Sequence, residues 1–359
     1  MLIGRTLARH IAFQLAKAIL VIFIVFIALV TVVDFTQQSR WIGAAGLTLP
    51  IALLTSALRG PSLAETVLPF AVLFGAMITF VQLNRRLELT VTRAAGVSAW
   101  QILTPAMLVT FLIGILTVLV YNPGAVALRD LSVNFAGVAT SGTLDDGGPV
   151  WIRQNGNDGA SIIGAERTGD DGARLNNVVA FLFAADGQLR LSLDAREALL
   201  VGNEWVFEEP LITERGVPAG RVDEFRIHTN LSLAQIRESL ADPATVAFWR
   251  LPGLIEIASA SALPATDLRM RFNTLLSLPF LLIAMVLIAA VVSLRFSRTL
   301  NLGRLVVTGA ASGFVLYVVL VVSGDLGRGG IVAPEIAAWA PVLLSTLVSI
   351  SFLLREEDG

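Results

Sequence analysis

The chain has 359 residues, of which 55% are hydrophobic and only 15% are charged, and its mean hydropathy is +0.75. An ordinary soluble domain carries about 25% charged residues, so this composition indicates an integral membrane protein. The net charge of −2 gives no sign of a nucleic-acid partner.

The residue inventory also excludes most kinds of catalytic site. The chain has no Cys, so neither disulfides nor thiolate metal sites can form. Its two His, His10 and His228, lie far apart in sequence, which argues against a histidine metal site or a catalytic triad. Lys17 is the only Lys and no glycine-rich run precedes it, so the chain has no Walker-type ATP site of its own. We therefore expect no catalytic residues, no metal and no cofactor.

Six apolar segments are each about as long as a membrane-spanning helix, which needs about 20 residues. They are Ile11–Val33, Ala64–Leu83, Ile102–Tyr121, Phe272–Leu294, Leu305–Ser323 and Ile336–Leu354. A signal peptide is the competing interpretation of the first segment, but this segment exceeds the usual apolar core of roughly 7–15 residues. The connection Asp34–Leu63 is mixed in composition, and we expect it to be exposed with an interfacial, partly helical piece.

The composition changes abruptly between the third and fourth segments. Residues 122–271 contain 20 acidic residues against 13 Arg, and the stretches VVAFLFAADGQLRLSL and ALLVGNEWVFEEPLI alternate with a period of two. Asp186-Gly187 and Gly202-Asn203 stand where tight hairpin turns are expected. We predict an all-β sandwich or jelly roll over roughly residues 134–233, followed by irregular or helical structure up to Arg271.

The expected fold is an α-helical membrane protein with six transmembrane helices, three on each side of an inserted all-β jelly-roll domain. Residues 1–121 hold the first three helices and residues 272–359 hold the last three. Residues 122–271 hold the β domain and the segment that returns to the membrane.

Basic residues predict the orientation of this plan. One set of connections carries Arg5, Arg9, Lys17, Arg85, Arg86, Arg93, Arg295, Arg298, Arg304 and Arg355. The opposite short loops carry only Arg40, Arg59 and Arg328. Because cytoplasmic loops are enriched in Lys and Arg, we expect both termini in the cytoplasm and the β domain across the membrane.

Residues 84–101, NRRLELTVTRAAGVSAWQ, form a short amphipathic loop between the second and third apolar segments. Leu87, Leu89 and Val91 alternate with charged residues, and Gly96 breaks the pattern. A short helix along the cytoplasmic membrane face, with one side offered to a partner, fits this pattern. An interfacial helix that only anchors the loop fits it equally well.

Charged residues inside a membrane span are costly and are therefore candidates for function. Four of them fall near span ends, where water reaches them: Lys17, Asp34, Glu65 and Asp325. An ion-driven carrier would be expected to have acidic residues near the bilayer midplane, and none of these stands there. On the outer side, Arg129, Arg269 and Arg271 either bind phosphate or pair with the carboxylates of the β domain.

Several motifs together match a known family. They are LPFAVLFGAMITFVQLNRRLELTVTRAAGVS, YNP after the third apolar segment, GRLVVTGAASGFVLYVV, and GGIVAPEIAAWAPVLL with its LLREEDG tail. The chain resembles the LptF/LptG family of lipopolysaccharide-export permeases over essentially its full length, and its closing stretch is more similar to the LptG branch. No single motif is diagnostic, but their order and the six-span plan with a β insertion are together specific.

The resemblance implies a bacterial inner-membrane half-transporter that pairs with a homologous second permease. A cytoplasmic ATPase dimer would power it, and its β domain would join a bridge of periplasmic jelly-roll proteins that carries lipopolysaccharide outward. The coupling helix of the family corresponds to residues 84–96. The residues expected to contact the ATPase are Arg85, Arg86, Glu88, Arg93 and Gly96.

One departure from the family pattern concerns the site for lipid phosphate. Members of the family often carry a basic residue about one turn before the acidic residue that ends the first helix, whereas Thr31 precedes Asp34 here. Arg40 is then the candidate for that charge. The full set of substrate candidates is Asp34, Arg40, Arg59, Arg129, Arg269 and Arg271.

The sequence thus predicts a permease subunit that extracts lipopolysaccharide from the inner membrane through a cavity lined by the first and fifth helices. One alternative is a membrane receptor or scaffold with a periplasmic sensing domain, although receptors usually append a cytoplasmic output domain. Another is an ABC permease for a different lipidic substrate, although such permeases place the outer domain between the first two spans.

Overall fold

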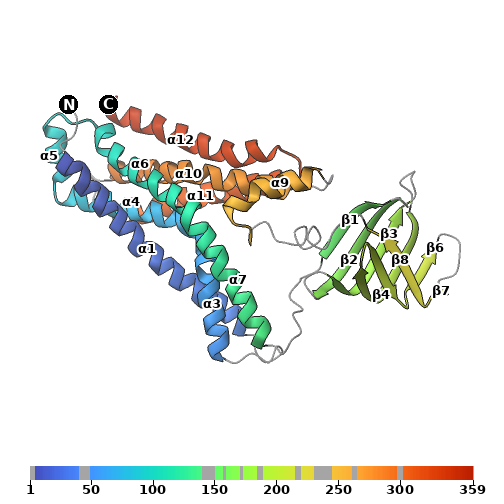
Figure 1. Ribbon diagram of the computed structural model, residues 1–359. Coiled ribbons are helices and arrows are strands. Elements are labelled where there is room, and N and C mark those ends of the chain that lie inside the picture. Colours follow the sequence, from blue (N-terminus) through green and yellow to red (C-terminus); the bar gives the residue numbers. More distant parts are fainter. Residues whose placement is uncertain are drawn as a thin grey trace.

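The structure, a computed structural model, describes residues 5–39, 49–139, 150–156, 159–169, 173–183, 189–214, 220–229, 245–260, 265–296 and 302–358. Helices form both ends of the chain and an antiparallel sheet forms its middle (Figure 1). The two termini and helix α5 lie at the end of the helical part that is remote from the sheet (Figure 1).

The helices before the sheet are α1 (Arg5–Ser39), α3 (Leu49–Ala64), α4 (Leu68–Arg85), α5 (Glu88–Ala94), α6 (Ala99–Leu116) and α7 (Asn122–Ala139). A 3₁₀ turn, η1 (Glu65–Val67), joins α3 to α4, and a π-helical turn, η2 (Thr117–Tyr121), joins α6 to α7. After the sheet follow a 3₁₀ turn, η5 (Phe248–Arg250), and the helices α9 (Leu251–Ala260), α10 (Thr266–Phe296), α11 (Leu302–Arg328) and α12 (Pro334–Asp358).

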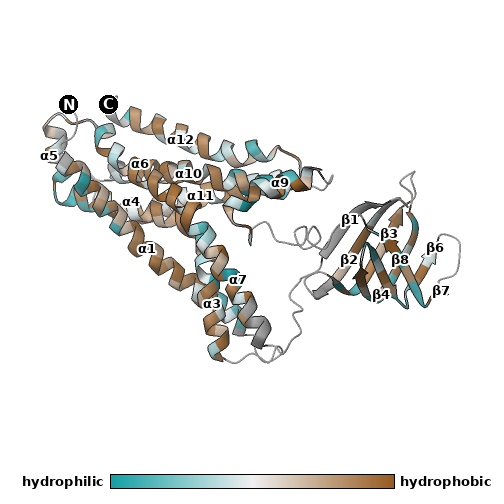
Figure 2. Cartoon of the chain, in the orientation of Figure 1, coloured by the Kyte–Doolittle hydropathy of each residue, from teal (hydrophilic) through white to brown (hydrophobic). Residues whose placement is uncertain are grey.

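Six helical stretches of the described chain are long and apolar enough to cross a membrane, three before the sheet and three after it. They are Thr6–Gln38, Leu49–Arg85, Ala99–Val133, Thr266–Ser293, Gly303–Arg328 and Pro334–Arg355. Figure 2 shows α1 and α12 to be hydrophobic along most of their length. The predicted plan of six helices with an inserted β region is confirmed.

The second and third helices extend further than the sequence predicted. Leu49–Leu63 was expected to be largely an exposed connection, but α3 continues through η1 into α4 as one stretch of 37 residues. Likewise, residues 122–139 were assigned to the β region, but they form helix α7. A stretch of 37 helical residues is longer than the about 20 residues that one span needs. In α3 the apolar sequence that the prediction used is interrupted by Arg59, Gly60 and Pro61.

Small residues explain how closely α3 packs against its neighbours. Ala52, Ser56 and Gly60 are buried on one face, which packs against α1 and α7. A Cβ atom on Gly60 would lie 2.2 Å from Oγ1 of Thr31, so the backbone of α3 approaches α1 closely. Such faces are typical of helix pairs in membranes.

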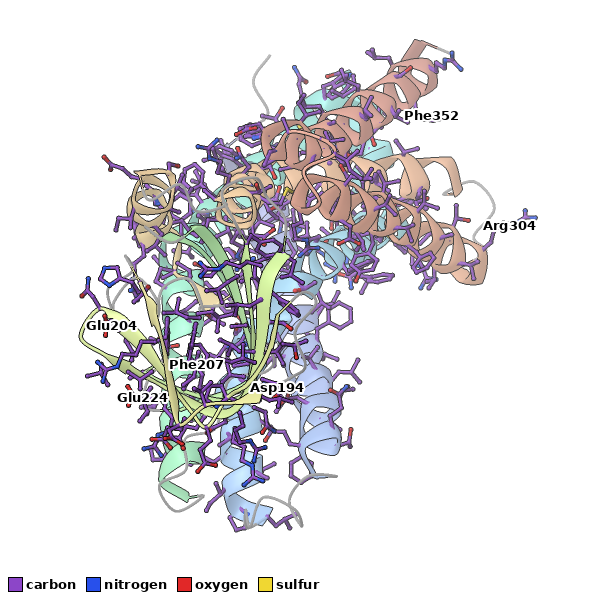
Figure 3. The ribbon with its side chains drawn as sticks, turned by 90° about the vertical axis from the view of Figure 1, so that its right-hand side faces the viewer. Asp194, Glu204, Phe207, Glu224, Arg304 and Phe352 are labelled. Atoms are coloured by element: carbon purple, nitrogen blue, oxygen red, sulfur yellow. The ribbon has the colours of Figure 1, made fainter. Side chains whose placement is uncertain are left out.

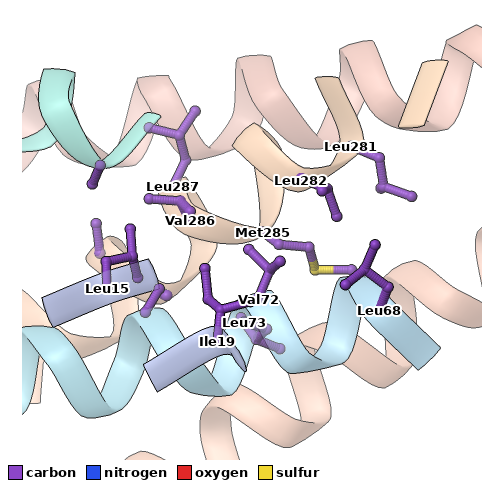
Figure 4. Close-up of a cluster of buried hydrophobic side chains, with 14 of the residues drawn as sticks. Leu15, Ile19, Leu68, Val72, Leu73, Leu281, Leu282, Met285, Val286 and Leu287 are labelled. Atoms are coloured by element: carbon purple, nitrogen blue, oxygen red, sulfur yellow. The ribbon is translucent and has the colours of Figure 1, made fainter. Parts of the chain in front are cut away.

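The core of the helical part lies between α1, α4 and α10. Figure 4 shows Leu15 and Ile19 of α1 facing Val72 of α4 and Met285 of α10, and all four side chains are at most 3% exposed. Two glycines allow this close packing. A Cβ atom on Gly75 would lie 2.8 Å from Cγ1 of Ile19, and one on Gly114 would lie 2.5 Å from Cα of Pro279.

The eight strands form a single antiparallel sheet. They are β1 (Val150–Gly156), β2 (Gly159–Gly169), β3 (Arg174–Phe183), β4 (Leu189–Val201), β5 (Glu204–Glu208), β6 (Leu211–Glu214), β7 (Gly220–Arg221) and β8 (Glu224–His228). Their main order is β1-β2-β3-β4-β5-β8, and β6 pairs with β4 and β7. The predicted turn at Gly202-Asn203 joins β4 to β5, with Gly202 at φ +65°. The other predicted turn, Asp186-Gly187, lies outside the described residues.

The sheet curves around its own core because β4 has two partners on one side. Its first part pairs with β6 and its last part pairs with β5. Figure 3 shows the sheet curving around Phe207, with Glu204 and Glu224 at its outer margin. Trp205 and Phe207 are fully buried. The predicted all-β insertion is confirmed.

The packing of α6 against α10 generates a test. Gly114→Ala should destabilise the protein by about 1–3 kcal/mol, because the added methyl group meets the backbone of Pro279 rather than a flexible side chain. Gly124→Ala is the matched control, since nothing lies within 4 Å of its Cβ position and Ala is the better helix former. Thermal unfolding in detergent should show a lower Tm for Gly114→Ala alone. Equal Tm values would mean that α6 and α10 are not packed this closely.

Candidate functional site

A buried carboxylate links three membrane helices at the end that faces the sheet. Glu65, in the η1 turn, is only 9% exposed. Nη2 of Arg271 on α10 donates a hydrogen bond to its Oε1 at 2.9 Å. Nδ2 of Asn122, at the start of α7, donates to its Oε2 at 2.8 Å. Both carboxylate oxygens are thus satisfied by groups far away in sequence, as a buried charge requires.

The same junction holds the segment that returns from the sheet. Oδ1 of Asn122 accepts a hydrogen bond from the backbone N–H of Phe248 at 2.9 Å. The ring of Phe248 stacks on that of Phe272, with centroids 5.5 Å apart. Nε1 of Trp249 donates to the carbonyl of Leu119 in the π turn at 3.2 Å. We refer to Glu65, Arg271, Asn122 and Phe248 as the junction network.

Proline accounts for the local geometry at Glu65. Pro69 has no N–H to donate to the carbonyl of Glu65, four residues earlier. That carbonyl instead accepts from the N–H of Leu68, three residues on, which tightens the helix into the 3₁₀ turn. The hydroxyl of Tyr121 donates to the carbonyl of Pro61 at 2.8 Å and fixes the π turn against the same region.

A cleft of about 510 Å³ adjoins the junction network. Four elements besides η1 line it: α4, α10, α11 and α12. Its polar side chains gather near one end and include Glu65, Asp267, Arg271 and Arg328, whereas Leu281 and Met285 line the part further along α10. The size falls within the range of roughly 300–1,000 Å³ that is usual for small-ligand sites.

The amphipathic loop contains the expected short helix, α5. Leu87, just before it, has φ +60°, and Gly96, just after it, has φ +83°, so the backbone turns sharply at both ends. Such a conformation is strained for Leu, and strain of this kind clusters at functional segments. Leu89 is buried, whereas Leu87 and Val91 are 61% and 67% exposed. The segment therefore has one face on the protein and one exposed apolar face.

Glu88 lies between two basic side chains. Its Oε2 is 3.4 Å from Nε2 of His10 on α1, and its Oε1 is 4.0 Å from Nη1 of Arg86. The side chains of Arg85 and Arg86 are exposed. The side chain of Arg93 lies outside the described set. The role of these residues and of Gly96 in contacting an ATPase stays a prediction.

The substrate candidates are dispersed in the structure. Arg269 donates through Nη2 to Oγ of Ser259 at 3.3 Å, and Arg271 is held by Glu65 rather than by the β domain. Arg59 on α3 and Arg129 on α7 are half-buried. Two further candidates lie at the end of α1 or beyond it: Asp34 accepts from Nε2 of Gln38 at 3.2 Å, and Arg40 lies outside the described residues. Binding of lipid phosphate by these residues stays a prediction.

The sequence interpretation missed Asn122 and His10 as partners of buried or functional carboxylates. Asn122 was treated as the start of a polar domain, and His10 was considered only as a metal ligand. One signal was present for each. Asn122 follows directly on an apolar run, and His10 belongs to the same basic side of the membrane as the loop.

The described chain has six membrane-length helices, an inserted antiparallel sheet and a buried ion pair between helices. These features define a multi-pass membrane protein with an inserted β domain. Residues 9–355 match the family described as lipopolysaccharide export system permease LptF/LptG, so the chain belongs to that family. It functions as a permease of the lipopolysaccharide export system.

Two relatives illustrate the similarity. The chain is 22% identical to the lipopolysaccharide export system permease protein LptG of Haemophilus influenzae, over 98% of this chain and 99% of the relative. It is likewise 22% identical to the protein of the same name from Escherichia coli K12, over 98% of each. The similarity therefore extends over the helices and the sheet alike.

The junction network generates the second test. Removing one partner of a buried ion pair costs about 3–5 kcal/mol, and the 22% exposure of the Arg271 side chain should lower this to roughly 2 kcal/mol for Glu65→Gln or Arg271→Gln. The double variant should lose less than the sum of the two single losses, because the two groups interact. Asp325→Asn is the control, since its pair with Arg328 is exposed on both sides. Additive losses in thermal unfolding would contradict the pairing.

Proposed function

We propose that this chain is one of two homologous permease subunits that extract lipopolysaccharide from the outer leaflet of the bacterial inner membrane, driven by a separate cytoplasmic ATPase dimer. The observation that carries the proposal is helix α5, whose Leu89 is buried on the protein while Leu87 and Val91 remain exposed. A chain without a Walker motif needs an external motor, and this exposed face is suited to one.

A second permease fits the exposed apolar faces of the first and fifth spans. On α1, Leu20, Ile24 and Leu29 are each more than half exposed, and on α11 the same holds for Phe314 and Val315. No residue of α1 lines the cleft within this chain. A substrate cavity between first and fifth spans therefore requires a partner subunit. Co-purification in mild detergent, with identification of the bound proteins and lipids, tests this assembly, and recovery of the chain alone would contradict it.

The motor contact is tested by reversing the charge of Glu88. Charge-assisted hydrogen bonds contribute about 1.5–3 kcal/mol each, so Glu88→Lys should weaken binding of the ATPase subunit about tenfold or more. His10→Gln is the matched control, because it removes the partner of Glu88 within this chain without changing Glu88 itself. A pull-down should lose the ATPase only with Glu88→Lys. Equal loss with both variants would mean that Glu88 serves to hold α5 against α1.

The sheet is proposed to lie in the periplasm and to extend into a bridge of jelly-roll proteins. An unpaired strand edge accepts a neighbouring strand by β-augmentation. Among the described strands, β1 stands at one end of the main order and pairs only with β2. The alternating sequence pattern predicted strands β3, β4 and β5 most clearly, but these three lie in the interior of that order.

One labelling experiment tests both the side of the membrane and the edge. The chain has no Cys, so Arg153→Cys in β1 and Asp223→Cys in the exposed β7–β8 connection are clean reporters. Arg153 stands opposite the half-buried Ile162, on the alternate face to the buried Ser161 and Ile163. Both variants should react with a membrane-impermeant maleimide in intact spheroplasts, and bound bridge proteins should protect Arg153→Cys alone. Failure of both to react would contradict the proposed orientation, and unchanged labelling at Arg153→Cys would show that the bridge attaches elsewhere.

Binding of lipid phosphates is the last part of the proposal. A phosphate contact to a partly desolvated Arg contributes about 1.5–3 kcal/mol, and an exposed one contributes less than about 1 kcal/mol, so several residues must act together. The double variant Arg40→Glu, Arg269→Glu should reduce lipopolysaccharide co-purification about tenfold while ATP hydrolysis by the complex continues. Arg226→Glu on the sheet is the control. If the double variant co-purified with the normal amount of lipopolysaccharide, the phosphates would be bound by other residues or by the partner permease.

A further inference from the structure

Helices α4 and α11 touch at one level of the membrane and enclose a cleft at another. Cβ atoms added to Gly309 and Gly313 of α11 would lie 2.3 Å from Sδ of Met77 and 2.5 Å from Cδ2 of Leu73, so side chains of α4 pack directly on the backbone of α11 there. One turn further along α11, Tyr317 contacts Phe70, with ring centroids 5.6 Å apart. From Tyr317 to the end of α11, the side chains that face α4 line the cleft instead.

The cleft is somewhat deeper than one membrane leaflet. Its lining on α10 includes both Arg271 and Met285, which follows 14 residues later. This separation corresponds to an axial rise of about 21 Å, whereas one leaflet contributes about half of the 30 Å hydrocarbon core. Between the two ends the lining is largely apolar and includes Leu275, Leu278 and Val321. The volume of about 510 Å³ suits a single small ligand.

The polar end of the cleft carries both signs of charge. Arg271 uses Nη2 for Glu65, and its buried Nε has no hydrogen-bond partner among the described residues. Arg328 lines the same end and pairs with the neighbouring Asp325 at 2.8 Å, in an exposed contact. Asp267 also lines this end. The lining of this end thus carries two carboxylates and two guanidinium groups, whose charges balance. A zwitterionic head group keeps that balance, whereas a purely anionic one adds an uncompensated charge.

We propose that this cleft binds one zwitterionic phospholipid of the phosphatidylethanolamine type, independently of the transported lipid. One acyl chain lies along the apolar wall between α4, α10 and α11. The phosphate accepts hydrogen bonds from Arg271 and Arg328, and the ammonium group lies at Asp267. Lipopolysaccharide is a poorer occupant, because its phosphates would bring uncompensated negative charge to an end whose own charges already balance.

A matched pair of substitutions on α11 tests the site. Val321 lines the cleft, whereas the adjacent Val322 does not, and both are exposed to a similar degree, 39% and 52%. The full-length chain, delipidated in detergent, is offered phosphatidylethanolamine and phosphatidylglycerol with identical acyl chains, and bound lipid is counted by native mass spectrometry. The wild type and Val322→Trp should retain one phosphatidylethanolamine. Val321→Trp, which fills the cleft, should bind it about tenfold more weakly.

The head group is tested separately. Asp267→Asn should abolish the preference for phosphatidylethanolamine over phosphatidylglycerol, since it removes the carboxylate that faces the ammonium group. Equal retention by Val321→Trp and Val322→Trp would overturn the proposal, because the lipid would then be an annular one. Retention of phosphatidylglycerol as strong as that of phosphatidylethanolamine by the wild type would also overturn it. A third outcome would also overturn the proposal. If purified lipopolysaccharide displaced phosphatidylethanolamine from the wild type and did not bind to Val321→Trp, the cleft would be a site for the transported substrate.

Discussion

The helical part of the molecule depends on neutralising Glu65 away from water. A carboxylate at this depth is costly unless it is paired and hydrogen-bonded. Here the two carboxylate oxygens accept hydrogen bonds from Arg271 and Asn122. Helices α10 and α7 must therefore both contact the η1 turn between α3 and α4. Because Asn122 also holds Phe248, the segment returning from the sheet is fixed to the same point. One buried charge thereby positions four parts of the chain that are distant in sequence.

Around this junction, packing is set by small residues and by breaks in regular helix geometry. Gly75 and Gly114 bring α1 onto α4 and α6 onto α10, where any side chain would clash. The 3₁₀ turn before Pro69 and the π turn before Asn122 alter the rotation of the helices that follow them. Each break stands next to a member of the junction network, so local backbone geometry and buried polar contacts support each other.

The sequence predicted those parts of the fold in which a single physical requirement restricts the choice of residue. Crossing a bilayer demands apolar runs, which located the six helices, and a tight hairpin demands a residue such as Gly202, which located the β4–β5 turn. Helices α3 and α7 were not predicted, because Arg59, Gly60 and Pro61 interrupt the apolar sequence of α3, and α7 begins with the polar and helix-breaking residues Asn122, Pro123 and Gly124. The pairing of Glu65 with Arg271 was also not predicted. These residues are 206 positions apart, and either is equally compatible with an exposed position at a span end.

The two ends of α4 connect the proposed motor contact to the junction network. At one end, Gln14 of α1 donates to Gln82 of α4 at 2.9 Å, and His10 of α1 meets Glu88 of α5. At the other end, α4 follows directly on η1, which begins with Glu65. Helix α5 is therefore connected to both α1 and α4, and the backbone has positive φ angles on either side of it, at Leu87 and Gly96. In the proposed transport cycle, α4 leads from α5 to Glu65, and the hydrogen bonds of Asn122 to Glu65 and Phe248 link this point to the segment that returns from the sheet.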